Sequence, residues 1–133
     1  MTPSFTHAIR VYWEDTDAGG VVYYANYLKF MERARTEWLR SLGFDQQVLR
    51  ASHGVVFVVR RVEIDYLAPA RLDDLLVVST QRTEMTRTCL TVAQEIVADQ
   101  PLTRALVQIV CIDPASFKPV KIPEPLLEKL TPP

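Results

Sequence analysis

The chain of 133 residues has the length of one ordinary domain, and we expect a single domain over residues 1–133. Hydrophobic residues make up 48% of the sequence and charged residues 23%, a balance typical of globular proteins and not of disordered chains. The formal net charge of -1 excludes strong electrostatic attraction to nucleic acid. The apolar runs are shorter than the roughly 18 residues that a membrane helix needs.

The first residues and the cysteines indicate a cytoplasmic protein. Residues 1–10 lack the basic head and apolar stretch of a signal peptide. Cys89 and Cys111 form no C-x-x-C pair and lie inside apolar segments, so we expect buried, reduced thiols.

Residues 5–13 alternate between two kinds of side chain. Period-two alternation predicts a strand, and it places Phe5, His7, Ile9, Val11 and Trp13 on one face. Residues 14–20 are polar and contain two glycines, so they predict a loop.

A long amphipathic helix is predicted over residues 23–42. Its polar positions form one solvent-facing stripe, and Gly43 suits a left-handed cap at the end. A short second helix is expected over residues 44–50. The apolar side of the long helix comprises Tyr24, Tyr27, Leu28, Met31, Ala34, Trp38 and Leu42.

The rest of the chain has the pattern of strands joined by short polar connections. We expect strands at residues 55–67, 75–83, 88–98 and 102–112, and one helical turn at 125–130. One broad apolar helix face needs a sheet to cover it, so the prediction is an α+β fold with an antiparallel sheet wrapped around the long helix. The free face and edge of such a sheet favour a homo-oligomer.

Residues 15–27 carry the candidate chemistry. Asp15 and Asp17 precede Gly19, Gly20 and the start of the long helix. Glycines let a ligand approach the backbone closely, and a helix start presents unpaired N–H groups. A carboxylate beside such donors suits acyl transfer or hydrolysis.

The acidic residues of this loop can also have purely structural roles. An Asp in this position is commonly a cap or turn residue, and we expect Glu14 and Asp15 to be solvated loop acids. A calcium loop counted from Asp15 fails because Asn26 stands where the distal Glu is needed, so we expect no metal site.

The stretch from residue 10 to 27 resembles the signature of the 4-hydroxybenzoyl-CoA thioesterase family, and more closely its YbgC branch of Tol-Pal-associated acyl-CoA thioesterases. The resemblance continues at residues 32–37, 57–60, 66–74 and 110–114. It implies a hotdog fold, dimers often paired into tetramers, and active sites between subunits. It also implies hydrolysis of acyl-CoA to free acid and CoA without a cofactor, since coenzyme A is part of the substrate.

The resemblance also implies roles for particular residues. The second Asp of the D-x-D motif is catalytic in the family and falls on Asp17, as nucleophile or as general base. The carbonyl-polarising backbone N–H falls on Tyr24, aided by Ala25, with Gly20 lining the site. Many YbgC-type proteins carry His where this chain has Tyr24, and a backbone donor survives that difference.

Basic groups are expected near the phosphates of CoA. Arg87, in a predicted turn, is the main candidate, Arg60 is a further one, and His53 could line the site. Two other functions remain open: a non-catalytic scaffold that binds acyl carrier protein or lipid-synthesis enzymes, and a hotdog dehydratase, for which only His53 could serve. Acyl preference and the choice between dimer and tetramer also remain open.

Overall fold

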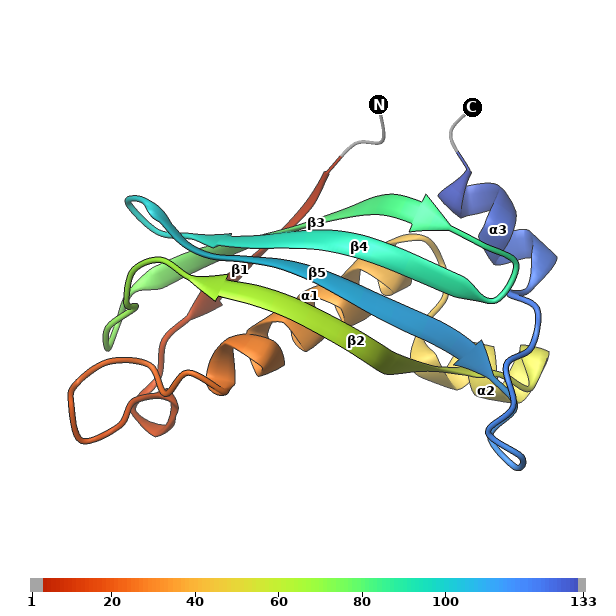
Figure 1. Ribbon diagram of the computed structural model, residues 1–133, viewed down its shortest axis with the longest axis horizontal. Helices are drawn as coiled ribbons and strands as arrows, with labels where there is room; N and C mark the ends of the chain where they lie inside the picture. The colour runs from red at the N-terminus through yellow and green to blue at the C-terminus, as the bar shows by residue number, and fades with distance from the viewer. Residues whose placement is uncertain (1–3, 132–133) are drawn as a thin grey trace.

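The computed structural model describes residues 4–131, which form one sheet and three α-helices (Figure 1). The elements, in chain order, are β1 (Phe5–Arg10), a short 3-10 helix η1 (Trp13–Asp15), α1 (Asn26–Ser41), α2 (Gln46–His53), β2 (Val56–Tyr66), β3 (Leu75–Met85), β4 (Cys89–Val97), β5 (Pro101–Ile112) and α3 (Glu124–Leu130).

The strands pair in the order β1-β3-β4-β5-β2, and every pair is antiparallel. Helix α1 lies across one face of this sheet (Figure 1). The predicted α+β architecture, an antiparallel sheet with one long helix against it, is therefore confirmed. The register shifts in β2 between Val59 and Arg61, which marks a bulge in this edge strand.

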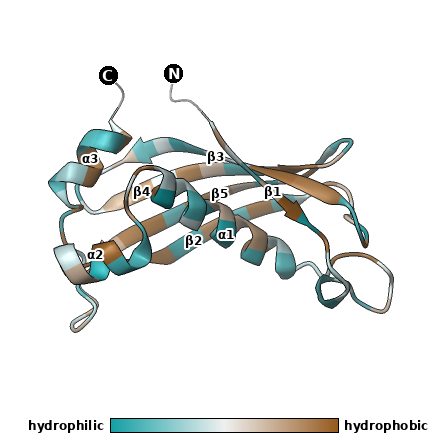
Figure 2. Cartoon of the chain, turned by 180° about the vertical axis from the view of Figure 1, so that it is seen from behind, coloured by the Kyte–Doolittle hydropathy of each residue, from teal (hydrophilic) through white to brown (hydrophobic). Residues whose placement is uncertain are grey.

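The core lies between α1 and the sheet. Tyr27, Phe30, Met31, Ala34 and Trp38 recur at helical spacing and are buried. They pack in one cluster with buried residues of the strands. Figure 2 shows hydrophobic stretches of the strands, in brown, behind the helix. Burying a large apolar side chain contributes about 1.5–3 kcal/mol, so this layer dominates the stability of the fold.

The long helix begins later than predicted. The chain makes a turn first, closed by a hydrogen bond from the Asn26 N–H to the Tyr23 carbonyl at 2.8 Å, and α1 starts at Asn26. Two residues predicted on its apolar face are exposed instead, Tyr24 at 62% and Leu28 at 39%. Tyr24 precedes the helix and so does not follow its period, and Leu28 lies just beside the buried stripe.

Strand β1 is also shorter than predicted. The Asp15 N–H bonds to the Tyr12 carbonyl at 3.0 Å, which turns the chain into η1. Trp13 is consequently 80% exposed and is not part of the core face. Phe5, His7 and Ile9 do face inward, toward α1.

Several predicted boundaries are confirmed or shifted by a few residues. Gly43 has φ +92°, as a left-handed cap requires. The second helix runs later than predicted because the Asp45 side chain caps it by accepting the Val48 N–H at 2.8 Å. The predicted turn near the C-terminus is α3.

Candidate active site

The turn that precedes α1 presents two unused backbone donors. Its first and last residues are joined by the hydrogen bond from Asn26 to Tyr23, which leaves Tyr24 and Ala25 at its centre. Among residues 4–131, no acceptor is bonded to the N–H of Tyr24 or of Ala25. These amides, at the positive end of a helix, can therefore bind an oxygen that carries negative charge.

Asp15 holds this turn in place. Its side chain is 5% exposed and accepts hydrogen bonds from the Tyr12 N–H at 2.8 Å and the Asn26 side-chain amide at 2.9 Å. Its main-chain carbonyl accepts the Tyr23 N–H at 3.0 Å. The prediction that Asp15 is a solvated loop acid is wrong, because the fold buries it between η1 and the start of α1. Glu14 is exposed, as predicted.

Asp17 lies in the loop that leads to the same turn. Its side-chain Oδ1 accepts the Gly19 N–H at 2.8 Å, and its backbone is bonded to Val21 and Gly20 at 2.9 and 3.0 Å. Within the described chain, its second oxygen has no hydrogen-bond partner. Gly20 has φ +79°, so it supplies the left-handed residue that closes the loop. The exposed Asp17 carboxylate is thus held at one oxygen and available at the other.

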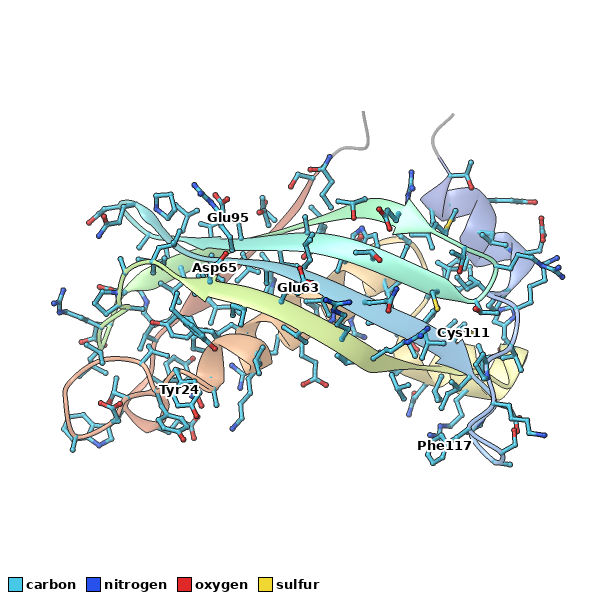
Figure 3. The ribbon with its side chains drawn as sticks, viewed as in Figure 1. Tyr24, Glu63, Asp65, Glu95, Cys111 and Phe117 are labelled. Atoms are coloured by element: carbon cyan, nitrogen blue, oxygen red, sulfur yellow. The ribbon has the colours of Figure 1, made fainter. Side chains whose placement is uncertain are left out.

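The loop and the turn belong to one end of the molecule. An isolated bridge pairs Thr16 with Val22, and a second pairs Val21 with Arg71. The first bridge closes the Asp17 loop onto the segment that enters α1, and the second ties that segment to the connection between β2 and β3. Figure 3 shows Tyr24 at this end and Cys111 at the other.

An apolar cleft of about 300 Å³ borders the turn. The Tyr66 hydroxyl donates to the Tyr24 carbonyl at 3.1 Å, and the Tyr27 hydroxyl accepts the Ala70 N–H at 3.0 Å. Burial, and to a lesser extent Tyr24 and Tyr27, raises the pKa of Tyr66 above its ordinary value. The cleft is lined by Val22, Tyr24, Tyr27, Tyr66, Leu67, Ala68 and Pro69.

Three predicted substrate-binding residues lie away from this end within one chain. His53 ends α2, and its ring lies 5.9 Å from that of Phe44. Arg87 lies in the turn between β3 and β4, at the far end of the sheet (Figure 1). Arg60 lies midway along β2, where its Nη1 is 3.8 Å from the Cys89 sulfur. One chain therefore places Asp17, Gly20, Tyr24 and Ala25 in adjacent segments at one end of the molecule, but not these three.

A hollow of about 630 Å³ lies on the outer face of the sheet and not at this end. It is bordered by Glu63, Asp65 and Glu95, labelled in Figure 3, and Glu95 forms an ion pair with Arg104 at 3.1 Å. None of its lining residues belongs to the Asp17 loop or to the turn before α1, so it is separate from the site described above.

Two further searches concern residues 4–131 only. No group of three or more His, Cys, Asp or Glu side chains is placed to hold a metal ion. No helix in this part is both long enough and apolar enough to cross a membrane.

Residues 19–105 match the family model of the thioesterase superfamily. The chain belongs to this superfamily. It is 49% identical over 128 residues to the acyl-CoA thioester hydrolase YbgC of Escherichia coli O157:H7, with 95% of each chain covered. It is 46% identical to the acyl-CoA thioesterase YbgC of Haemophilus influenzae, covering 90% of this chain and 89% of the relative.

Solved structures of superfamily members have the same architecture. A probable thioesterase from Bartonella henselae superimposes with a TM-score of 0.86 at 36% identity, covering 91% of this chain and 100% of that one. A 1,4-dihydroxy-2-naphthoyl-CoA thioesterase from Synechocystis gives a TM-score of 0.88 at 29% identity, with 96% of each chain covered. The YbgC-like resemblance, the hotdog fold and the thioesterase class are therefore confirmed.

Sequence reasoning missed two residues that shape this thioesterase site. The sequence pattern predicts a solvated Asp15, and it marks Tyr66 only as part of a stretch that resembles the family. The bond from the Tyr12 N–H is local, a cap three residues away, but the bond from Asn26 spans 11 residues and forms only when the chain turns back to α1.

Proposed function

We propose that this thioesterase hydrolyses acyl-CoA to a free acid and CoA, with Asp17 as its catalytic carboxylate. The observation that carries the proposal is the pair of unbonded amides at Tyr24 and Ala25, in the turn to which the Asp17 loop is tied by backbone bridges. The YbgC relative at 49% identity, named an acyl-CoA thioester hydrolase, supports the substrate class.

In this mechanism the thioester oxygen accepts hydrogen bonds from the two amides. Attack at the acyl carbon moves negative charge onto that oxygen, where the amides and the helix end stabilise it. The tetrahedral intermediate then collapses, the carbon–sulfur bond breaks, and the CoA thiolate leaves and takes up a proton.

Asp17 can serve through either of two routes. As a general base, its free oxygen takes a proton from water while the water attacks the acyl carbon. As a nucleophile, that oxygen attacks the acyl carbon itself, and water then hydrolyses the resulting anhydride. A single turnover in ¹⁸O-water that labels the Asp17 carboxylate would demonstrate the anhydride route, because only attack of water on the aspartyl carbonyl of an anhydride can place solvent oxygen there.

We also propose that the complete site forms between two copies joined along β2. This strand is a free edge of 11 residues, whereas the other edge, β1, has 6. Val58, Val59 and Tyr66 of β2 and the following Leu67 are exposed, and an unpaired apolar edge favours association.

Such pairing would also explain the scattered basic residues. Tyr66 lies at the end of β2 next to Tyr24, and Val56 lies at the other end. Antiparallel pairing about the middle of β2 would bring the Val56 end of the second copy, with its Arg87 and His53, toward the Tyr66 end of the first, while Arg60 would stay near the middle of the paired strands. The phosphates of CoA would then meet guanidinium groups.

The test is a thiol-release assay over a panel of acyl-CoAs with the purified full chain. For Asp17→Asn we expect kcat to fall by roughly 10²- to 10⁴-fold with an unchanged fold, as loss of an acid–base group predicts. Asp99→Asn, an exposed acid in the β4–β5 connection, is the matched control and should retain activity. Undiminished turnover by Asp17→Asn, or no hydrolysis of any acyl-CoA by the unaltered protein, would overturn the proposal.

A further inference from the structure

The peptide unit between Tyr24 and Ala25 lies at the centre of the turn. Its carbonyl belongs to Tyr24 and accepts the Tyr66 hydroxyl at 3.1 Å, while its N–H belongs to Ala25 and is unbonded in the described structure. A trans peptide is planar, so its oxygen and its hydrogen point in opposite directions. A group that holds the Tyr24 carbonyl oxygen therefore also sets the direction of the Ala25 N–H.

We propose that Tyr66 is a positioning residue for hydrolysis: its hydroxyl holds the Tyr24 carbonyl and thereby aims the Ala25 N–H at the thioester oxygen. This inference rests on the proposed function. Tyr66 contacts the substrate oxygen only through the peptide, so it is not itself a catalytic group.

No other described residue bonds to the Tyr24 carbonyl. The neighbouring peptides are held by the backbone, since the Tyr23 carbonyl accepts the Asn26 N–H at 2.8 Å and the Ala25 carbonyl accepts the Leu28 N–H at 3.2 Å. The central peptide of a turn is the unit that rotates between turn types. Ala25, at φ -71° and ψ -20°, disfavours the full flip, which needs positive φ at that position. Tyr66 therefore limits smaller rotations of this peptide plane.

Tyr66 is well placed to act as such a restraint. It is the last residue of β2 and pairs with Thr103 of β5, so the sheet fixes its backbone. Its ring meets those of Tyr24 and Tyr27 edge-on, with centroids 6.1 and 5.6 Å apart. Its hydroxyl is a donor in the neutral range, and burial raises its pKa further above the ordinary value.

The experiment compares Tyr66→Phe with Tyr23→Phe in the full chain. Tyr66→Phe keeps the ring and removes the donor, whereas no described residue is bonded to the Tyr23 hydroxyl. We expect Tyr66→Phe to lower kcat by roughly 3- to 20-fold with little change in KM. Without the Tyr66 hydroxyl, the Ala25 N–H is less well aimed, and its hydrogen bond to the oxygen in the transition state weakens. Tyr23→Phe should have near-normal kcat. Replacing Tyr66 by p-aminophenylalanine, whose amine can donate to the same carbonyl, should restore part of the loss.

A spectroscopic readout separates positioning from a merely structural role. In the Asp17→Asn background, the infrared carbonyl stretch of a bound benzoyl-CoA should shift to lower frequency, because the amides polarise the carbonyl. Adding Tyr66→Phe should reduce that shift, and adding Tyr23→Phe should not. This readout applies even if Tyr66→Phe lowers the folded fraction, since it reports only on occupied sites.

The outcomes distinguish this inference from the proposed function. If Asp17→Asn abolishes hydrolysis while Tyr66→Phe matches the unaltered enzyme in kcat and carbonyl shift, the proposed function stands and the role of Tyr66 is refuted. A change confined to KM, or a loss that p-aminophenylalanine does not reverse, also overturns it. If the unaltered protein hydrolyses no acyl-CoA, both fail.

Discussion

The carboxylate of Asp15 accepts a hydrogen bond from the side-chain amide of Asn26 at 2.9 Å and so joins η1 to the first residue of α1. The other carboxylate oxygen accepts the Tyr12 N–H at 2.8 Å. This buried acid therefore fixes the position of the turn whose amides face the substrate in the proposed mechanism. Asp15 and Asp17 are two residues apart, yet one is structural and the other is exposed and available.

Replacing Asp15 by Ala should destabilise the protein by about 1–3 kcal/mol, because two partly buried donors lose their acceptor. The free energy of unfolding from urea titration measures this change. Glu14→Ala, on the neighbouring exposed acid, should change it by no more than about 0.5 kcal/mol. Equal effects of the two substitutions would contradict the assignment of Asp15 as the anchor of the turn.

The two adjacent glycines of the Asp17 loop should respond differently to alanine. A Cβ at Gly19 would lie 3.2 Å from the Asp17 Oδ1, so Gly19→Ala should displace the carboxylate. We therefore expect a clear fall in kcat and little change in the free energy of unfolding. A Cβ at Gly20 meets no atom within 4 Å, but its φ of +79° is costly for Ala. Gly20→Ala should therefore cost about 1 kcal/mol of stability. Measuring kcat and urea unfolding for both variants tests the contrast, and the reverse ranking would refute it.

A buried polar network connects α1 to the centre of the sheet. Gln94 is 2% exposed, accepts from the Arg35 guanidinium at 2.9 Å, and donates to the Met31 carbonyl and the Thr80 hydroxyl at 3.0 and 2.9 Å. Desolvation lowers the pKa of Arg35, and Glu32 partly opposes that effect. Arg35 thus depends on Gln94 for its hydrogen bond within the described residues.

Gln94→Leu should consequently destabilise the protein by about 2–3 kcal/mol, since it leaves a largely buried guanidinium without its acceptor. Combining it with Arg35→Leu should cost at least about 1 kcal/mol less than the sum of the single changes, because the double variant has no stranded charge. A double-mutant cycle by urea unfolding measures this coupling. Strict additivity would show that the two side chains do not support each other.

Cys111 should make stability depend on alkaline pH. Burial raises the pKa of its thiol to about 11, above the ordinary value of 9.0. Folding therefore favours the protonated thiol, and this contribution is complete below about pH 9 and lost as the pH rises through about 11. The stability difference between the unaltered protein and Cys111→Ala should shrink over that window. A difference that stays constant or grows would contradict the burial of this thiol as a neutral group.

The proposed pairing along β2 predicts that a charge on this edge lowers the mass of the oligomer in solution. Val59 is 47% exposed on this edge, and a lysine there should oppose edge-to-edge association. Val59→Lys should shift the protein toward monomer in light scattering and lower its hydrolytic activity. Val77→Lys, at a residue of β3 that is 41% exposed, is the matched control and should leave the mass unchanged. An unaltered protein that is monomeric and active would refute the composite site.

The local hydrophobic pattern predicted most helices and strands, but it did not predict where β1 ends and α1 begins near the candidate site. Alternation identified the strands, and the spacing of Tyr27, Met31, Ala34 and Trp38 identified the helix and its buried side. The errors at Trp13 and Tyr24 both fall where the chain leaves its regular period to turn. At such points side-chain and backbone hydrogen bonds, and not hydrophobic period, decide the path.

The sequence by itself determined the α+β architecture, the order of the elements and the D-x-D segment before α1, because these depend on local periodicity and on motif residues adjacent along the chain. Tertiary structure alone decided which of the two acids is buried, which amides are left unbonded, and that Tyr66 reaches the Tyr24 carbonyl across 42 residues. It also placed Arg87 and His53 far from Asp17 in one chain. The physical reason is that a hydrogen bond forms between whichever groups the packing of distant segments brings together, and residue spacing does not encode those distances.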